Sequence, residues 1–396
     1  MNKSKKKLVF IQTTGAWWDH RYYFKQMPAL CETADVSYLI REDETFKKDK
    51  NNKFDVIQIS KKKADWARKT GGVNLLFKLV KMKYDGIQLC NIELLPLGIL
   101  LALFTKSKVF YDCREDHFHA MLHSKVWFPI WLRYILAYGV KFLEFFASKT
   151  FTGFVDSDPA IYNFHKYISK NKKMIFYNMA LKSQFNLVDR NDNREFFFCV
   201  LGSMSIRTGV LDVVKAFSVI NQLGYDCKLK LIGDPHFDKI LSKSINDLIS
   251  SKNLSNMIKI TGKVPYHKVP FELAECKVGV IPLLNIPKFQ NNIATKQFEY
   301  MSSEMAIISS DLAPQRLFIN ENENGLFYEA GNVDDLVKKM IYLLDNPLKI
   351  KEFSSRSKQL TETKWNAEQQ QQKICKFYGL RLKNKSYTET QLPPFS

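Results

Sequence analysis

The sequence has no long apolar run, which bears on whether the chain spans a membrane. Its longest apolar run, Leu94 to Phe104, has 11 residues and contains Pro96, whereas a transmembrane helix needs about 20 apolar residues. Behind the basic start MNKSKKK, the stretch LVFIQ is too short for the core of a signal peptide, so we interpret it as the first strand. We therefore expect a cytoplasmic protein.

The sequence also lacks the cysteine and acidic patterns of metal sites. Its seven cysteines, at positions 31, 90, 113, 199, 227, 276 and 375, form no CxxC pair and have no metal-ligand spacing. Several stand in apolar, strand-like runs, and we predict that they are reduced core residues. No acidic metal cluster and no recognisable nucleic-acid-binding module is present, so we expect neither a metal nor a nucleic acid as partner.

Composition indicates a globular chain with an uneven charge. The 396 residues are 45% hydrophobic and 25% charged, which suits about two or three domains with proper cores. The formal charge is +19, and residues 1–185 hold 31 Lys+Arg against 17 Asp+Glu, or +14 of that total. A basic half attracts polyanions such as anionic lipid or a phosphate-bearing substrate. Solubilising charge in a lysine-rich chain explains the same excess equally well.

An aromatic segment in the basic half carries a second ambiguity. Residues 126–146 read VWFPIWLRYILAYGVKFLEFF and are interrupted by Arg133, Lys141 and Glu144. Such a segment fits a helix that lies in a membrane interface. It also fits a helix that packs on the first domain's sheet with its cations reaching solvent.

Short apolar runs alternate with helical stretches along the chain, which predicts parallel sheets covered on both faces. We expect strands near residues 8–12, 36–40, 56–59, 87–90, 109–112, 150–155, 174–177, 196–201, 228–232, 258–261, 278–281 and 306–309. Helices are expected near 209–222, 238–252, 295–302 and 333–345, with a final helix from Lys364. The polar stretch 183–195 is typical of a linker. We predict an α/β fold with domains at 1–185 and 186–380 and a tail at 381–396.

Two segments of the second half have the chemistry of a nucleotide-sugar site. In ATKQFEYMSSEMAIISSD, Lys296 and Glu299 share a helical face, so an ammonium for phosphate stands beside a carboxylate for a ribose diol. In GSMSIRTGVLDVVKAF, a glycine loop with Arg207 precedes a helix that opens at Gly209. Loop amides, a helix N-terminus and a guanidinium together would bind an anion.

These two segments belong to an ordered series of five that resembles the retaining glycosyltransferases of family 4, also called group 1. The other three segments are KLKLIGD, ITGKVPYHKVPFELAECKVGVIPL and NENGLFYEAGNVDDLVKKMIYLL. The resemblance covers the chain from about Phe196 to the final helix. It implies the GT-B fold, in which two Rossmann-like, doubly wound domains face each other across a cleft and the C-terminal helix returns to the N-terminal domain.

The resemblance also implies roles for residues of the second half. Glu299 would hydrogen-bond the ribose hydroxyls, and Lys296, which follows Thr295 in the sequence, would face the diphosphate. The loop with Gly202, Ser203, Thr208 and Gly209 would hold the diphosphate, while Arg207 offsets leaving-group charge. Lys263 and Val264 would border the base. Two positions depart from the family: Asn291 replaces the first glutamate of the usual pair, and Thr208 replaces a lysine.

In the first half the resemblance is looser. The loop TTGAWWDHR matches a family glycine loop in which Gly15 allows close approach to the donor phosphates. YDCRE matches a segment whose histidine position holds Arg114, while His117 and His119 follow on the same stretch. Either histidine would face the cleft or be an ordinary polar residue. Asn178, in MIFYNMA, matches an asparagine near the cleft.

The resemblance implies a metal-independent, hexosyltransferase-type enzyme that uses a UDP- or GDP-linked sugar and retains the anomeric configuration. Arg207, Lys296, Asn291 and His117 are the candidate catalytic residues. We expect no cofactor beyond the donor, and a glycan or lipid-linked acceptor in cell-surface glycan synthesis, with peripheral contact to an anionic membrane at the inner face of the plasma membrane. The departures at Asn291, Thr208 and Arg114 keep open a non-catalytic GT-B subunit that scaffolds a partner transferase.

Overall fold

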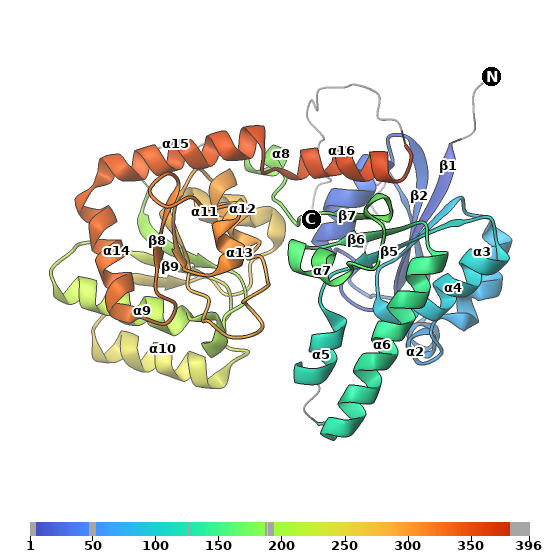
Figure 1. Cartoon of the computed structure of the whole chain (residues 1–396). Coiled ribbons are helices and arrows are strands. Elements are labelled where there is room, and N and C mark those ends of the chain that lie inside the picture. Colours follow the sequence, from blue (N-terminus) through green and yellow to red (C-terminus); the bar gives the residue numbers. More distant parts are fainter. Residues whose placement is uncertain (1–4, 47–52, 125–126, 187, 189–193, 381–396) are drawn as a thin grey trace. The chain divides into compact units, whose positions relative to one another are not determined.

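The computed structural model describes residues 5–46, 53–124, 127–186, 188 and 194–380. They form two compact units (Figure 1). The first comprises the chain up to Asn178 together with the residues from Glu368 onward, and the second comprises Met179–Ala367. Each unit is built on one parallel sheet.

The first unit has a seven-stranded sheet in the order β3-β2-β1-β4-β5-β6-β7, and all of its strand pairs are parallel. Its strands are β1 (Lys6–Gln12), β2 (Ala34–Arg41), β3 (Asp55–Ile59), β4 (Gly86–Leu89), β5 (Lys108–Cys113), β6 (Gly153–Asp156) and β7 (Lys173–Ile175). Its helices are a π-helical turn (His20–Gln26), α1 (Met27–Leu30), α2 (Lys61–Lys69), α3 (Leu76–Met82), α4 (Leu95–Phe104), α5 (His117–Ser124), α6 (Ile130–Thr150), α7 (Pro159–Phe164) and, past the second unit, α16 (Ala367–Phe377).

Both faces of this sheet are buried, because successive side chains of a strand point to opposite sides. Val9 and Ile11 of β1 lie in one core cluster with residues of α2, α3, α4 and α6. Leu8 and Phe10 lie in another with residues of α1 and α16. The unit is therefore doubly wound.

The last described helix belongs to the first unit, as expected from the family resemblance. The ring of Tyr378, just after α16, stacks on Phe110 of β5 with centroids 4.1 Å apart. Phe377 lies over Gly153, where an added Cβ atom would stand 2.5 Å from the ring. Only a glycine leaves room for this contact, so α16 packs closely on β6 at this position.

The second unit has a six-stranded parallel sheet in the order β10-β9-β8-β11-β12-β13. Its strands are β8 (Phe196–Leu201), β9 (Leu229–Ile232), β10 (Ile258–Ile260), β11 (Cys276–Ile281), β12 (Ala306–Ser310) and β13 (Gly325–Tyr328). Its helices are α8 (Lys182–Phe185), α9 (Val210–Gln222), α10 (Lys239–Ser251), α11 (Val269–Ala274), α12 (Lys296–Ser302), α13 (Ala313–Arg316), α14 (Val333–Asp345) and α15 (Pro347–Thr363).

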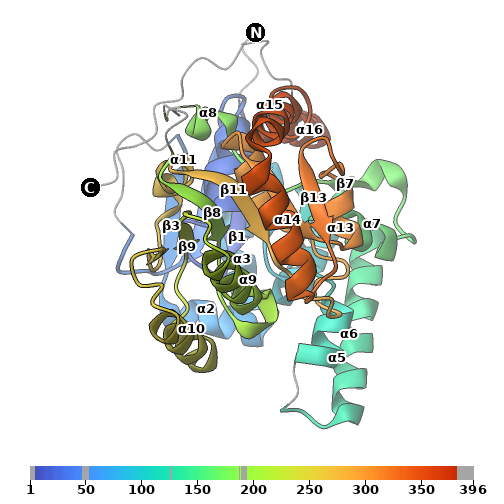
Figure 2. The ribbon, with the colours of Figure 1, turned by 90° about the vertical axis from the view of Figure 1, so that its left-hand side faces the viewer.

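Strand β11 shows how this sheet too is covered on both sides. Val278 and Val280 lie in the core cluster beneath α9, α10 and α14, and Figure 2 shows α9 and α14 side by side in front of the strands. Gly279, between them, faces the ring of Tyr300 on α12. Helix α12 therefore lies on the opposite face. The prediction of two doubly wound domains is confirmed.

Each sheet has a point where the strand order reverses, between β1 and β4 in the first unit and between β8 and β11 in the second. Loops leaving adjacent strands at such a point separate to opposite sides and leave a crevice at the carboxyl edge, where ligands collect. The two glycine loops picked out in the sequence follow β1 and β8. Topology thus brings both to ligand-binding positions of their own sheets.

The structure corrects three expectations about the elements. Helix α6 continues to Thr150, so the strand predicted from 150 begins only at Gly153. The final helix starts at Ala367 instead of Lys364, because α15 ends at Thr363. In the second unit, strand β13 and helices α8, α11, α13 and α15 are absent from the predicted set. The tail at 381–396, Val126, and residues 187 and 189–193 of the predicted linker lie outside the described residues.

Among the described residues, no helix combines the length and the apolarity needed to cross a bilayer.

Candidate functional site

The second unit's glycine loop begins at Gly202, directly after β8 at the switch point. Gly202 has φ 112°, and a Cβ atom added to it would lie 3.7 Å from Cε and 3.8 Å from Nζ of Lys296. Behind it, a Cβ on Gly233 would lie 2.2 Å from the Gly202 carbonyl oxygen. Gly202 therefore supplies the positive φ of the loop, and the missing Cβ of Gly233 lets the loop approach the end of β9.

The rest of the loop is a tight turn that leads into α9. The Thr208 hydroxyl accepts a hydrogen bond from the Ser205 amide at 3.0 Å and donates one to the Ser205 carbonyl at 2.8 Å. Thr208 therefore orders the turn by its side chain, while Ser203 and Arg207 are exposed. Gly209 has φ 69°, and a Cβ there would lie 1.8 Å from the Pro282 carbonyl oxygen, so no other residue fits this close approach to the end of β11.

Asp238, which the sequence analysis did not select, fixes the loop from the side. Its carboxylate accepts the Ile206 amide at 3.0 Å and, as N-cap of α10, the Leu241 amide at 3.1 Å. These backbone hydrogen bonds, with smaller help from Arg207, lower the pKa of Asp238. Its N-cap position ahead of an apolar helical stretch was a usable sequence signal.

Lys296 and Glu299 lie together on α12, one helical turn apart. Burial lowers the pKa of Lys296 to about 8, and the nearby Glu299 carboxylate opposes that shift. The side chain is half-buried, so its ammonium has lost part of its water without an anion that fully replaces it. A cation in that state is well suited to a phosphate, which would restore the lost solvation.

Tyr300, also missed by the sequence analysis, holds α12 at the switch point. Its buried hydroxyl accepts the Leu201 amide of β8 at 2.8 Å and donates to the Val280 carbonyl of β11 at 3.2 Å. A Cβ on Gly279 would lie 2.4 Å from the ring. The side chain bridges β8 and β11, the paired strands whose loops diverge, and so it sets the position of its neighbours Lys296 and Glu299.

Other predicted residues of this unit lie farther along the same edge. Thr295 is exposed immediately before α12, and Asn291 is exposed in the loop between β11 and α12. Lys263 is exposed and Val264 half-buried in the turn after β10, the edge strand. The structure brings Lys296, Glu299 and the Gly202 loop together, whereas Lys263 and Val264 follow a strand two positions from β8.

A polar cavity of about 470 Å³ lies at the same carboxyl edge, beyond β12 and β13. Its lining includes Asp311, Glu321, Glu329 and Lys339, together with Arg316, whose Nε lies 2.5 Å from Asp311 Oδ1. None of the predicted site residues lines it. Its position shows that polar groups follow every strand on this side of the switch point.

In the first unit, Gly15 lies in the loop after β1 with φ 96°. A Cβ there would stand 2.5 Å from Nε2 of Gln12. Asn91, just after β4, joins the two sides of this switch point: its Oδ1 accepts the Thr13 amide at 2.8 Å and its Nδ2 donates to the Thr14 hydroxyl at 2.6 Å. The loop is thus tied to the neighbouring strand end.

Arg114 and His117 occupy the carboxyl end of β5 and the start of α5. Arg114 Nη1 lies 2.6 Å from Asp19 Oδ2, so this arginine is paired with the glycine-loop segment. His117 is half-buried, with its Nδ1 3.8 Å from Glu115 Oε1. His119 Nδ1 lies 2.5 Å from Asp116 Oδ2. Each histidine therefore has a carboxylate neighbour on its own segment.

Sequence reasoning also missed two basic residues of the π-helical turn. Arg21 is buried with its Nε 2.9 Å from Asp112 Oδ1, and its Nη1 donates to the Phe176 carbonyl. Lys25 Nζ donates to Asn178 Oδ1 at 2.6 Å. Their spacing of four along a helix that follows a glycine loop was the available signal. They connect β1's loop to the ends of β5 and β7.

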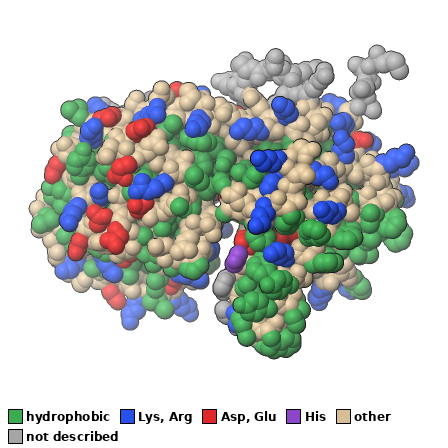
Figure 3. All heavy atoms as spheres, viewed as in Figure 1, with side chains coloured by type: hydrophobic (Ala, Val, Ile, Leu, Met, Phe, Trp, Pro, Cys, Tyr) green, Lys and Arg blue, Asp and Glu red, His purple; other side chains and the backbone are tan. Residues whose placement is uncertain are grey.

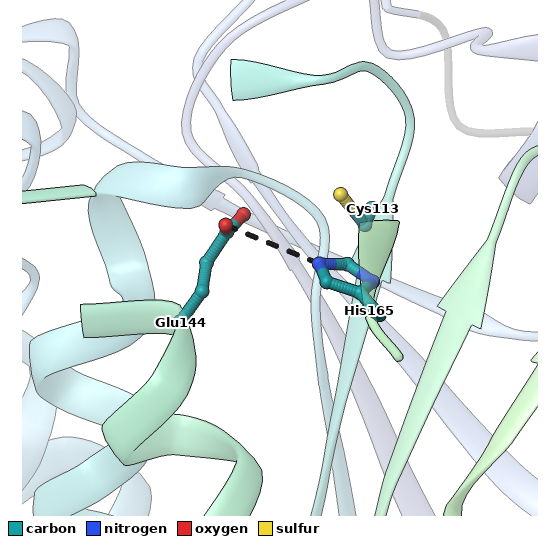
Figure 4. A group of neighbouring side chains, drawn as sticks. All are labelled: Cys113, Glu144 and His165. Carbon is teal, nitrogen blue, oxygen red and sulfur yellow. Dashed lines mark ion pairs between the residues drawn. The ribbon is translucent and has the colours of Figure 1, made fainter. Parts of the chain in front are cut away.

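Among the described residues, one group has the side chains of a metal site: Cys113, Glu144 and His165, whose donor atoms lie within 4.8 Å of one another (Figure 4). All three are buried in the first unit. His165 Nδ1 lies 2.8 Å from Asp156 Oδ1, an arrangement common for zinc-binding histidines.

Without a bound ion, the side chains of this group form an ion network. Burial alone would lower the pKa of His165, but hydrogen bonding to Asp156 and pairing with Glu144 raise it to about 9. Burial raises the pKa of the Cys113 thiol well above its usual value, so in the absence of an ion this group is a neutral thiol. We interpret the group as an imidazolium held between two carboxylates.

Comparison with known proteins agrees with this geometry. Residues 185–360 match the family model described as glycosyl transferases group 1. With the two Rossmann-like units, the fold is GT-B. No curated protein sequence matches the chain.

Solved structures match nearly the whole chain at low identity. A glycosyltransferase from Rickettsia africae has a TM-score of 0.72 at 12% identity, covering 95% of this chain and 98% of its own. HepE from Anabaena, in complex with UDP and glucose, has 0.69 at 13%, covering 94% and 99%. Sucrose-phosphate synthase from Thermosynechococcus elongatus has 0.69 at 14%, covering 95% and 98%.

Proposed function

We propose that this protein is a retaining, family 4 glycosyltransferase that moves a hexosyl group from a nucleotide sugar to a lipid-linked or polysaccharide acceptor in cell-surface glycan synthesis. One observation carries the proposal. The desolvated ammonium of Lys296 lies against the Gly202 loop at the switch point of the second sheet. That is a site for a diphosphate, with the Glu299 carboxylate one turn away for a ribose.

Each of these residues has its own role toward the donor. Lys296, a cation at neutral pH, and the exposed Arg207 offset the charge that develops on the departing diphosphate. Free amides at the start of α9 add partial positive charge at the same edge. Glu299 accepts hydrogen bonds from the ribose hydroxyls. The acceptor hydroxyl attacks on the face of the leaving phosphate, which takes the proton, and no metal is required when these groups balance the charge.

The donor is UDP- or GDP-linked, and HepE in complex with UDP supports the former. A thermal-shift panel of UDP-, GDP-, ADP- and CMP-sugars tests donor binding, since a ligand selective for the native state raises its stability. At 100 times its Kd a donor adds about 2.7 kcal/mol, a shift of a few degrees. We expect one base to stand out, with the shift lost in Lys296→Ala.

Lys338→Ala is the matched control, because Lys338 is exposed on α14 and the variant removes the same charge. No shift with any of the four donors in the wild type, or an equal shift in Lys296→Ala, contradicts the proposed donor site.

The second candidate is a non-catalytic GT-B subunit that scaffolds a partner transferase. Asn291 stands in place of a carboxylate, and the Thr208 hydroxyl is engaged by the turn at Ser205. Arg114, at the family's histidine position, is paired with Asp19. Donor binding without any nucleotide release by the purified protein would favour this role.

We further propose that the enzyme works in the cytoplasm at the inner face of the plasma membrane, where a lipid-linked acceptor is available. The net charge of the first half supports attraction to anionic lipid.

A further inference from the structure

Helix α6 presents most of its large apolar side chains to solvent, whereas the residues that it buries are small or polar. The buried residues of this helix are Ala137, Glu144, Ala147 and Ser148. Beyond the first residue, Ile130, which is also exposed, the exposed set, at 43% to 65% of full exposure, is Trp131, Tyr134, Ile135, Tyr138, Phe142, Phe145 and Phe146. A helix that only packed on the sheet would show the reverse distribution.

The exposed set forms one stripe. Its members recur at spacings of three and four, so at 3.6 residues per turn they occupy an arc of about 120° along most of the helix. With roughly 200 Å² per large side chain, the seven leave on the order of 700 Å² of side-chain surface exposed. The largest apolar patch of an ordinary monomer is about 300–600 Å².

A second group of exposed apolar residues lies on neighbouring helices of the same unit. Phe77 of α3 is 85% exposed and Phe104 of α4 is 76% exposed, with Val80 and Leu103 beside them. Helix α4 packs against α6. Figure 3 shows hydrophobic side chains gathered over α6 and over the α3 and α4 side of the unit.

The charges around this surface select its partner. Residues 76–108 carry five lysines against Asp85 and Glu93, and the two carboxylates are engaged, Asp85 with the Lys7 amide and Glu93 with the Thr13 hydroxyl. On α6, Lys149 Nζ lies 4.9 Å from the Phe145 ring centre, beside the stripe. Basic residues bordering Trp, Tyr, Phe and Ile are typical of helices that lie in the headgroup region of anionic bilayers.

We propose that the α6 stripe, joined by the exposed ends of α3 and α4, is a docking surface for an anionic lipid bilayer. The aromatic rings enter the boundary between headgroups and acyl chains, while Lys78 and Lys81 of α3 and Lys106, just after α4, contact lipid phosphates. The inference deepens the membrane location in the proposed function. It does not depend on sugar transfer, because the surface lies on the first unit and its test uses no donor.

Flotation of the full chain with vesicles tests this proposal. Wild type should float with phosphatidylglycerol/phosphatidylcholine vesicles, less at 0.5 M salt, and weakly with phosphatidylcholine alone. Trp131→Ala with Phe142→Ala should reduce partitioning at least tenfold, because it removes two exposed rings of the stripe. Lys78→Glu with Lys81→Glu should reduce binding only to the anionic vesicles.

The control variant, Phe237→Ala with Leu348→Ala, removes residues of the second unit that are 84% and 79% exposed, and it should float like wild type. Far-UV circular dichroism and the melting temperature verify that each variant is folded.

Three outcomes would overturn the proposal. They are wild type that does not float, a Trp131/Phe142 variant that floats as wild type does, and a wild type that self-associates in sedimentation through the same residues without binding lipid. The last would assign the stripe to a contact between copies of the chain. None of them bears on the donor panel, so failure here leaves the proposed sugar transfer standing.

Discussion

At the scale of single residues, Lys296 combines a partly desolvated ammonium with a pKa of about 8. A bound diphosphate favours the charged form, so the complex retains a proton that the free protein loses above pH 8. Affinity for UDP should therefore be constant up to about pH 8 and fall by up to about tenfold per pH unit above it. Calorimetry in two buffers of different ionisation enthalpy would detect the accompanying proton uptake.

Lys296→Arg provides the control for this pH dependence, because guanidinium stays charged throughout the range. Its UDP affinity should be flat to at least pH 9.5. An affinity in the wild type that does not change between pH 7.5 and 9.5 would mean that the Lys296 ammonium does not face the phosphates.

His165 makes a prediction about stability. Its folded-state pKa of about 9 lies above an unfolded value of about 6.5. The ion network therefore stabilises the fold fully below about pH 6.5 and loses that contribution as pH rises through 9. The loss is on the order of 3 kcal/mol.

The advantage of wild type over His165→Asn in urea unfolding should accordingly narrow between pH 6.5 and 9. His236→Asn, on the exposed surface of the second unit, should leave the pH dependence as it is in the wild type. A wild-type advantage that is equally large at both pH values would contradict the charged state assigned to His165.

At the scale of elements, Tyr300 holds α12 across the divergence of β8 and β11. Tyr300→Phe leaves the buried Leu201 amide and Val280 carbonyl without this partner, at a cost of about 1–3 kcal/mol. Unfolding by urea should show that loss, together with weaker UDP binding because α12 carries Lys296 and Glu299. Tyr342→Phe, on the outer side of α14, should change stability by less than about 0.5 kcal/mol. Unaltered stability in Tyr300→Phe would remove Tyr300 from this role.

The sequence predicted these elements wherever a continuous apolar run dominates, and twelve such runs became twelve strands. It missed β13 because GLFY is four residues long inside the polar segment NENGLFYEAG, and α15 because most of its seventeen residues are polar. Lys296, Glu299 and the Gly202 loop were selected by residue type and spacing. The bridge by Tyr300 depends on how α12 lies over Gly279, and the Thr208 hydrogen bonds depend on the turn. Neither has a signature in local sequence.

At the scale of the whole molecule, the last helix completes the first unit's core although it follows the second unit in the chain. Tyr378 is buried and stacks on Phe110. Tyr378→Ala should therefore cost about 3–5 kcal/mol, measured by urea unfolding with a probe in the first unit. Tyr134→Ala deletes the same side-chain atoms at an exposed position on the α6 stripe, so it should cost little stability. Equal losses in both variants would contradict the assignment of α16 to the first unit's core.

The two units account for different parts of the proposed function, which is why their sequence signals differ. In the second unit, the glycines and the lysine of the proposed nucleotide site are residue types that phosphate binding favours, so they were visible in the sequence. In the first unit, the relevant feature is a surface. An apolar stripe that faces solvent has the same sequence pattern as one that faces the core, and only the structure shows which residues of α6 are buried. The sequence of the aromatic segment therefore allowed two interpretations.

The central claim is that the Lys296 and Glu299 site turns over a nucleotide sugar. The most direct test is release of nucleotide from the donor selected by the thermal-shift panel, measured with wild type, Glu299→Ala and the exposed control Glu362→Ala on α15. We predict release by wild type and the control, and at least a hundredfold less by Glu299→Ala. Release that survives unchanged in Glu299→Ala, or no release by wild type despite donor binding, would contradict the claim.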